Sequence, residues 1–494
     1  MNELNYISHQ GGKIKMKAKW LSCCFMAVLI SITSVMSGAQ VPPPGSGRDA
    51  AHFIPMRQRV KMMEQFWAWK KQHVLPMIMR EQGVDMWIVR SDEEPLYRQA
   101  SYSEHPVYLS LLPANQGGMV LPSKYARTGM DVPKILIFYD TGKEIEFIEP
   151  RDYEEITEIV RKRDPKKIAI SMKNLYIERR KIGDTEQLTV VKSDKLQKVL
   201  GKKYAARTVD SWHLGILWLS ICSPEQISAY RYVQGVQNDI LAEAFSNQAI
   251  IPDFTTIGDL NWWIRHRYLE LDLDCDNHPY VNIRRRPSKI AQYKESAKYF
   301  RQGMTTAENV IIRRGDIVGL DSDIMLLGLE TDTQYYAYVL QEGEKDVPPS
   351  LKRVLRIMNE MLDEYRKVYV VGRTAQEIID AGNKIKPKDP MMVEAEFGFH
   401  PLPMYIRRFS ENGLKFSRGT YVAGIGSGYK QHPLLSPKLT LHYNTLYAHE
   451  PHFSFAVPEW GEEKLSFAIE QGVVFTERGC EFLDRGNLEW FVIK

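Results

Sequence analysis

The chain has little net charge, few cysteines and no long uninterrupted apolar segment. Its 65 basic and 61 acidic side chains leave a formal net charge of +4, which is too weak to indicate nucleic-acid binding. Five cysteines among 494 residues exclude a scaffold built on disulfides. With 44% hydrophobic and 26% charged residues, the composition is that of a globular protein long enough for more than one domain.

The first 39 residues have the order of a secretory signal peptide. A lysine-rich segment at 13–19 precedes an apolar segment at 21–36, and Ser37, Gly38 and Ala39 form a small-residue cleavage site. The apolar segment is shorter than the roughly 18 residues of a spanning helix, so we expect no stable membrane anchor. We therefore expect cleavage after Ala39 and an exported protein, periplasmic or extracellular, with Met16 as an alternative start.

Two domains are expected after a proline- and glycine-rich linker at 40–56. Residues 57–215 have the pattern of an α/β domain, in which a helix at 56–82 ends at Gly83. Residues 222–494 form the second domain, whose first helix begins at the capping box of Ser223 and Gln226. Strands are expected in the first domain at 86–89, 135–139, 144–148 and 167–170, and further helices in the second at 256–270, 351–368 and after Thr374.

Residues 315–340 predict a β-hairpin that carries two aspartates. Asp321 ends an apolar run, and Asp332 opens a run rich in tyrosine and valine. With the turn centred on Leu326 and Leu327, the two aspartates are expected directly opposite each other and on one face of the sheet. Carboxylates that close repel unless a proton or a cation separates them. The alternative is a pair of solvated aspartates beside a turn.

A second hairpin is expected near the C-terminus. Glu450 and Glu470 end two apolar runs, and residues 458–461, Pro-Glu-Trp-Gly, form the turn between them. Residue 460 is the midpoint, so the two glutamates are expected to face each other. Four converging carboxylates suit two divalent cations held by hard oxygen ligands.

These motifs resemble the pita-bread metallopeptidases, which include Xaa-Pro aminopeptidases, prolidases and methionine aminopeptidases, together with the metal-free creatinases. The resemblance covers residues 223–494, and the N-terminal half more loosely. It implies an α/β N-terminal domain followed by an α+β pita-bread (creatinase-like) C-terminal domain. It rests on the two aspartates, AGIG at 423–426, HEP at 449–451, PEWG at 458–461 and AIEQGVVFTERG at 468–479.

The resemblance also implies an activity and a set of site residues. The activity is that of an exported Xaa-Pro aminopeptidase-like metallopeptidase that hydrolyses N-terminal peptide bonds with two divalent ions: Mn, Co or Zn. Glu450 is the expected base, Lys430 would stabilise the oxyanion in place of a histidine, and His432 lies near the expected ligand loop. The metal ligands carried over are Asp321, Asp332, Glu450 and Glu470.

The chain departs from the family at its histidines. Residues 421–426 match the family's ligand segment with Ala423 in place of the ligand histidine, and two further family histidines fall at Lys430 and near Gln302. Water in place of the lost nitrogen donor would favour Mn, Mg or Ca over Zn. Replacement by another imidazole is the alternative. The candidates are His452, His432, His278, and His400 if the alignment of 421–426 is wrong.

Three functions therefore compete. The first is the metallo-exopeptidase, acting on a peptide substrate. The second is a catalytically inactive homologue that binds peptides or serves as a scaffold, and the third is a metal-free enzyme on the same fold. A homodimer is left open in each case.

Overall fold

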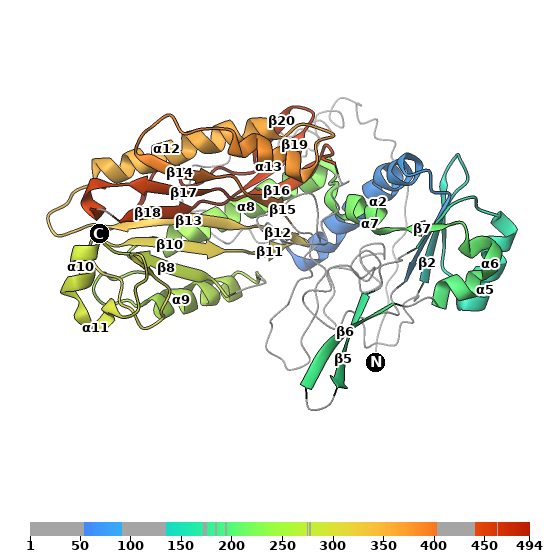
Figure 1. Ribbon diagram of the computed structural model, residues 1–494, viewed down its shortest axis with the longest axis horizontal. Coiled ribbons are helices and arrows are strands. Elements are labelled where there is room, and N and C mark those ends of the chain that lie inside the picture. The colour runs from blue at the N-terminus through green and yellow to red at the C-terminus, as the bar shows by residue number, and fades with distance from the viewer. Residues whose placement is uncertain are drawn as a thin grey trace, which may run out of the picture. The chain divides into compact units, whose positions relative to one another are not determined.

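The computed structural model describes residues 54–90, 135–170, 175–182, 185–192, 195–273, 275, 278–402, 440–461 and 463–494 (Figure 1). These residues belong to one compact unit, Gly47–Lys494. Within the described ranges, none of the helices has the length and apolar composition that crossing a bilayer requires.

The N-terminal part is built on a five-stranded mixed sheet, as its alternating pattern predicts. Its strand order is β3-β2-β1-β4-β7. Strand β1 pairs antiparallel with β2 and parallel with β4. The strands are β1 (Met86–Arg90), β2 (Ile135–Asp140), β3 (Ile145–Ile148), β4 (Ile168–Ile170) and β7 (Thr208–Asp210), and a separate hairpin consists of β5 (Leu175–Ile182) and β6 (Thr185–Lys192).

Helices cover both faces of this sheet. Because side chains alternate along a strand, Trp87 and Val89 pack with the helices on one face, and Met86 and Ile88 with those on the other. The first face carries α2 (Met56–Glu81) and α7 (Trp212–Ser220), and the second α5 (Tyr153–Arg163) and α6 (Lys195–Ala205). Strands β1 to β4 and α2 lie within one residue of their predicted ranges, whereas the sequence did not predict β5, β6 and β7.

Two helices of the C-terminal part begin at the predicted capping boxes. Ser223 and Gln226 close a capping box at the start of α8 (Pro224–Ala244), and Thr374 and Glu377 do so for α13 (Ala375–Asn383). Each box satisfies two backbone N–H groups that a helix start leaves unpaired. The other helices are α9 (Ile257–Glu270), α10 (Pro287–Gln292), α11 (Lys294–Ala297), α12 (Pro349–Tyr365), η2 (Arg366–Val368) and η3 (Pro458–Trp460).

Three sheets and a short hairpin make up the β-structure of this part. Their orders are β21-β13-β10-β8-β9, β14-β17-β18, β15-β16-β19-β20 and β11-β12. The strands of the first sheet are β8 (Tyr280–Arg284), β9 (Met304–Thr305), β10 (Ile317–Ser322), β13 (Thr333–Val339) and β21 (Phe491–Ile493). The others are β11 (Met325–Leu326), β12 (Leu329–Glu330), β14 (Met392–Glu396), β15 (Phe399–Pro401), β16 (Thr445–His449), β17 (His452–Ala456), β18 (Lys464–Ala468), β19 (Gln471–Thr476) and β20 (Gly479–Phe482).

Strands β10 and β13 lie between two apolar clusters. Val318 and Tyr335 belong to the cluster that includes α8 and α9, whereas Ile317 and Tyr336 belong to the cluster that includes α12. The hairpin that carries the two aspartates is therefore packed on both faces. Tight packing of this kind holds side chains in place better than a solvated sheet would.

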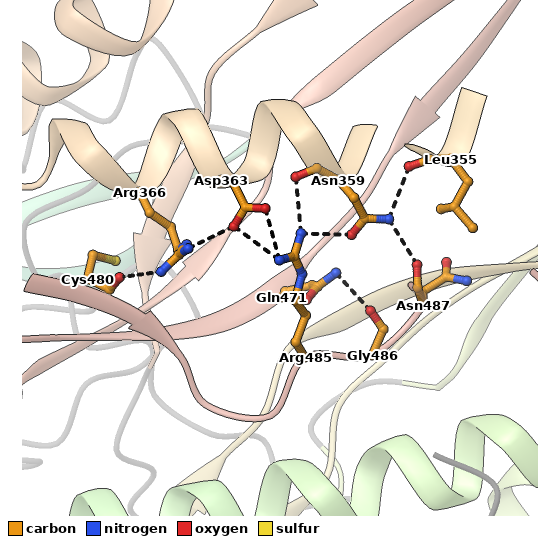
Figure 2. A network of polar contacts seen from close by, with 9 residues as sticks. All are labelled: Leu355, Asn359, Asp363, Arg366, Gln471, Cys480, Arg485, Gly486 and Asn487. Atoms are coloured by element: carbon orange, nitrogen blue, oxygen red, sulfur yellow. Dashed lines mark hydrogen bonds and ion pairs between the residues drawn. The ribbon is translucent and has the colours of Figure 1, made fainter. Parts of the chain in front are cut away.

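A polar network ties α12 to the C-terminal loop (Figure 2). Arg485 donates to both carboxylate oxygens of Asp363, at 3.0 Å each, and to the backbone and side-chain oxygens of Asn359. The Asn359 amide in turn donates to the carbonyl of Asn487, whose side chain accepts from the backbone N–H of Tyr336 on β13. The loop thus joins α12 to the strand that follows Asp332.

Candidate metal centre

The first hairpin forms as predicted, but its register differs from the prediction. Asp321 pairs with Gln334, and Ser322 with Thr333, so Asp321 and Asp332 are not directly opposite each other. The turn is centred on Leu327 and Gly328, one position later than expected, and both residues have positive φ, 59° and 70°. Glycine accepts this conformation readily, whereas leucine rarely does, so local sequence rules favoured the wrong turn.

The second hairpin has the predicted register. His452 pairs with Ala468 on one side, and His449 with Gln471 on the other. Both pairs share one register, which places Glu450 and Glu470 at facing positions between them. The turn is the predicted Pro458–Trp460 segment, closed by Gly461 at a φ of 66°.

The two hairpins are joined at their centres. Gln334 and Glu470 exchange two backbone N–H···O hydrogen bonds, each of 3.1 Å. Gln334 lies two residues after Asp332, so this bridge places Glu470 beside the strand that Asp332 precedes. Carboxylates separated by 138 positions in the chain, Asp332 and Glu470, thereby come together.

His400 completes the cluster. Its Nε2 lies 3.0 Å from Oε1 of Glu470 and 3.4 Å from Oδ2 of Asp332. One ligand atom from each of these three residues lies within 4.8 Å of the others. His400 is on β15 and pairs with Ala448 of β16. Ala448 lies two positions before Glu450 in the chain. His400, one of several histidines that the sequence left as alternatives for the lost nitrogen donor, is therefore the imidazole that lies against these carboxylates.

The carboxyl groups of the cluster raise one another's pKa values. Burial raises the pKa of Asp321 to about 7, with a further contribution from the charge of Glu450 that His400 partly opposes. Burial also raises the pKa of Asp332, helped by Glu470, and that of Glu470, helped by Glu450 and Asp321. The four predicted carboxylates thus act on one another, and each buried charge is costly without a positive partner.

The remaining predicted residues have different positions. Glu450 is 19% exposed in its side chain, and Nε2 of His452 lies 3.9 Å from it. His452 is on the same side as Glu450, as expected, but its side chain is 61% exposed. His278 packs against Trp262. Residues 421–426 with Ala423, and also Lys430 and His432, lie outside the described residues.

Sequence reasoning missed two further features near the cluster. Asp323 is buried, and its charge contributes to the raised pKa values of Asp332 and Glu470. It follows Asp321 by two positions, and strand periodicity would have placed it on the same face. Two buried glutamines of α8, Gln234 and Gln237, hydrogen-bond to the hairpin from behind. In the sequence, these two glutamines could have been recognised as a pair of amides on a largely apolar helix face.

The chain is similar to solved structures of pita-bread peptidases, while no protein-family model and no curated protein matches its sequence. Against X-Pro aminopeptidase from Thermotoga maritima MSB8 the identity is 12%, the coverage 83% of this chain and 98% of that one, and the TM-score 0.49. Against prolidase from Pyrococcus horikoshii OT3 the identity is 11%, the coverage 87% of this chain and 98% of that one, and the TM-score 0.43. Against an Escherichia coli aminopeptidase P variant the identity is 12%, the coverage 87% of this chain and 95% of that one, and the TM-score 0.46.

At these identities and TM-scores the comparisons carry no argument about the activity of this chain. The chemistry of the site has to be inferred from the residues of this chain.

Proposed function

We propose that the protein is a divalent-metal-dependent exopeptidase that hydrolyses N-terminal peptide bonds, with a preference for Xaa-Pro substrates. The observation that carries the proposal is the convergence of Asp332, His400 and Glu470, whose ligand atoms lie within 4.8 Å of one another. The substrate preference follows the motif resemblance of residues 223–494.

The donor set fits a divalent cation. Two carboxylates and one imidazole combine hard oxygen ligands with a nitrogen, a set that suits Mn, Co and Zn. Nδ1 of His400 lies 3.1 Å from the carbonyl oxygen of Pro401. A neutral ring that donates from Nδ1 presents its Nε2 lone pair to the carboxylates, which is how metal-bound histidines are commonly oriented.

Asp321 and Glu450 supply ligands for a second cation. Each contributes to the electrostatics of the same cluster, and Glu450 stands opposite Glu470 on the second hairpin. Asp332, His400 and Glu470 would hold the first cation, and Asp321 with Glu450 the second. The presence of His400 replaces the expectation of an all-oxygen shell, and with it the preference for Mg or Ca.

Bound cations would lower the pKa of water and polarise the peptide carbonyl. The side chains of Glu450 and Asp332 are exposed to nearly the same extent, 19% and 20%. We assign Glu450 as proton acceptor, as the motif resemblance implies. Glu470, with a side chain only 3% exposed, is assigned to holding its neighbours and the cations in place. Proton transfer by a positioned group typically contributes about 10²–10⁴-fold to rate.

The experiment combines elemental analysis with a peptide panel. Purified protein is loaded separately with Mn, Co and Zn, and assayed on short Xaa-Pro peptides and on the same peptides with alanine in place of proline. His400→Ala should lower both metal content and turnover. His266→Ala is the matched control, because His266 is exposed on α9 and pairs with Glu270.

Each outcome assigns a function. Metal uptake with hydrolysis of Xaa-Pro peptides supports the proposal. Metal uptake without hydrolysis of any peptide favours the inactive homologue that binds peptides. A protein that takes up none of the three metals refutes the proposal.

A further inference from the structure

A second polar layer lies behind the carboxylates. Ser322 and Thr333 directly follow Asp321 and Asp332, pair with each other across β10 and β13, and are both buried. Side chains alternate between the two faces of a strand, so Ser322 lies on the face opposite Asp321. What holds Ser322 and Thr333 therefore acts on the aspartates through a single residue of backbone.

Two fully buried amides of α8 hold this pair. The Nε2 group of Gln237 donates to Oγ of Ser322 at 2.8 Å and to its carbonyl oxygen at 3.1 Å. The Nε2 group of Gln234 donates to Oγ1 of Thr333 at 2.9 Å. Both glutamines are 0% exposed.

The spacing of the two glutamines along the helix matches the spacing of Ser322 and Thr333 across the two strands. Cβ atoms at positions i and i+3 of a helix are about 5–6 Å apart. Cβ atoms of directly opposite residues in an antiparallel pair are about 4.5–5.5 Å apart. The i,i+3 pair Gln234 and Gln237 is therefore in step with the cross-strand pair Ser322 and Thr333.

The layer continues to the C-terminal loop. Gln234 also donates to the side-chain oxygen of Asn238, whose amide donates to the backbone and carboxylate oxygens of Asp484. Apolar residues would be the cheaper choice at such buried helix positions, since an amide costs free energy unless its hydrogen bonds are made. Here the amide groups of Gln234 and Gln237 donate to Thr333 and Ser322, the residues that follow Asp332 and Asp321.

We propose that Gln234 and Gln237 are positioning residues, which hold the Ser322 and Thr333 pair and so set the separation of Asp321 and Asp332. The part of this inference that is measured through metal binding rests on the proposed function. Neither glutamine is assigned a contact with metal or substrate.

The test compares Gln237→Leu with Gln226→Leu. Gln226 is a buried amide of the same helix, but it lies in the first turn, where its side-chain oxygen accepts from the backbone N–H of Ser223 in the capping box. Calorimetry measures the Mn dissociation constant, the visible spectrum of the Co-loaded protein reports ligand geometry, and urea unfolding reports stability. Thr333→Val is a second variant, which removes the acceptor of Gln234 while keeping a side chain of nearly the same shape.

We expect the Mn dissociation constant of Gln237→Leu to rise about tenfold, at the lower end of the effects of outer-shell substitutions. Its Co spectrum should change, and adding Ser322→Ala should have little further effect, because the two residues act as a pair. Gln226→Leu should lose stability without either change. Equal dissociation constants and equal spectra for Gln237→Leu and Gln226→Leu would overturn the inference.

Hydrogen exchange of the metal-free proteins separates this inference from the proposed function. Gln237→Leu should lose amide protection in residues 317–339, and Gln226→Leu should not. If wild type binds none of Mn, Co and Zn, the proposed function fails, and the exchange result alone decides the positioning role: unchanged protection in 317–339 rejects it.

Discussion

Replacing Lys70 by methionine should stabilise the protein at neutral pH. Lys70 lies on α2 with 0% exposure, and its Nζ has no hydrogen-bond partner among the residues that the structure describes. The Nζ is 5.5 Å from the ring centroid of Trp67 and 5.0 Å from that of Trp218. Burial lowers the pKa of Lys70 to about 8, against an opposing effect of Cys222. The favourable contacts of the cation with the two indoles therefore do not offset its desolvation.

The magnitude and the sign follow from the two pKa values. The folded pKa of about 8 is below the ordinary 10.5, so the unfolded chain binds more protons between these values and stability rises with pH there. Below about pH 8 the full penalty applies, and a difference of about 2.5 pKa units corresponds to about 3 kcal/mol. Lys70→Met removes that penalty and keeps an unbranched chain that packs well against aromatic rings.

The assay is urea unfolding of wild type and Lys70→Met near pH 7, 9 and 10.5. We expect the free energy of unfolding of the variant to exceed that of wild type by about 2–3 kcal/mol near pH 7, and the difference to shrink as pH approaches 10.5. Lys61→Met, at an exposed position of the same helix, serves as the control and should show no such trend. A variant less stable than wild type near pH 7, or a difference independent of pH, would refute the reasoning.

Three other predictions concern packing, capping and export. Gly486→Ala should destabilise the fold by about 1–3 kcal/mol in thermal unfolding, because the added Cβ would lie closer than 3.0 Å to the ring of Tyr335; an unchanged melting temperature would contradict it. Ser223→Ala should cost about 1 kcal/mol, because Ser223 caps α8 through the N–H of Gln226, whereas the exposed Ser228→Ala should cost less. Mass spectrometry of the mature protein should find an N-terminus after Ala39, and a protein beginning at Met1 would refute export by a cleaved signal.

Several elements could be predicted because their causes are local. The capping boxes of α8 and α13 need only residues three positions apart, and the turn at residues 458–461 is marked by its proline and glycine. The register of the second hairpin follows from a turn that the sequence marks well. The register of the first hairpin could not be predicted in the same way, because its turn places Leu327 in the left-handed region.

The nitrogen donor of the candidate metal centre shows the same limit. Motif alignment indicated that the ligand histidine is replaced by Ala423 and left several histidines as alternatives, of which His400 lies against Asp332 and Glu470. Nothing in the residues around His400 distinguishes it from the other histidines, because its role depends on the pairing of β15 with β16. That pairing is a long-range contact, which no local pattern encodes.

The sequence by itself determined the candidate site residues, two aspartates and two glutamates at the ends of apolar runs, and the helices that begin with capping boxes. Tertiary structure decided how these residues meet. The bridge between Gln334 and Glu470 joins the two hairpins, β15 brings His400 to them, and Gln234 and Gln237 of α8 hold the strands from behind. Hairpin faces follow from alternation within a few residues, whereas contacts between separate hairpins and helices depend on the packing of the whole chain.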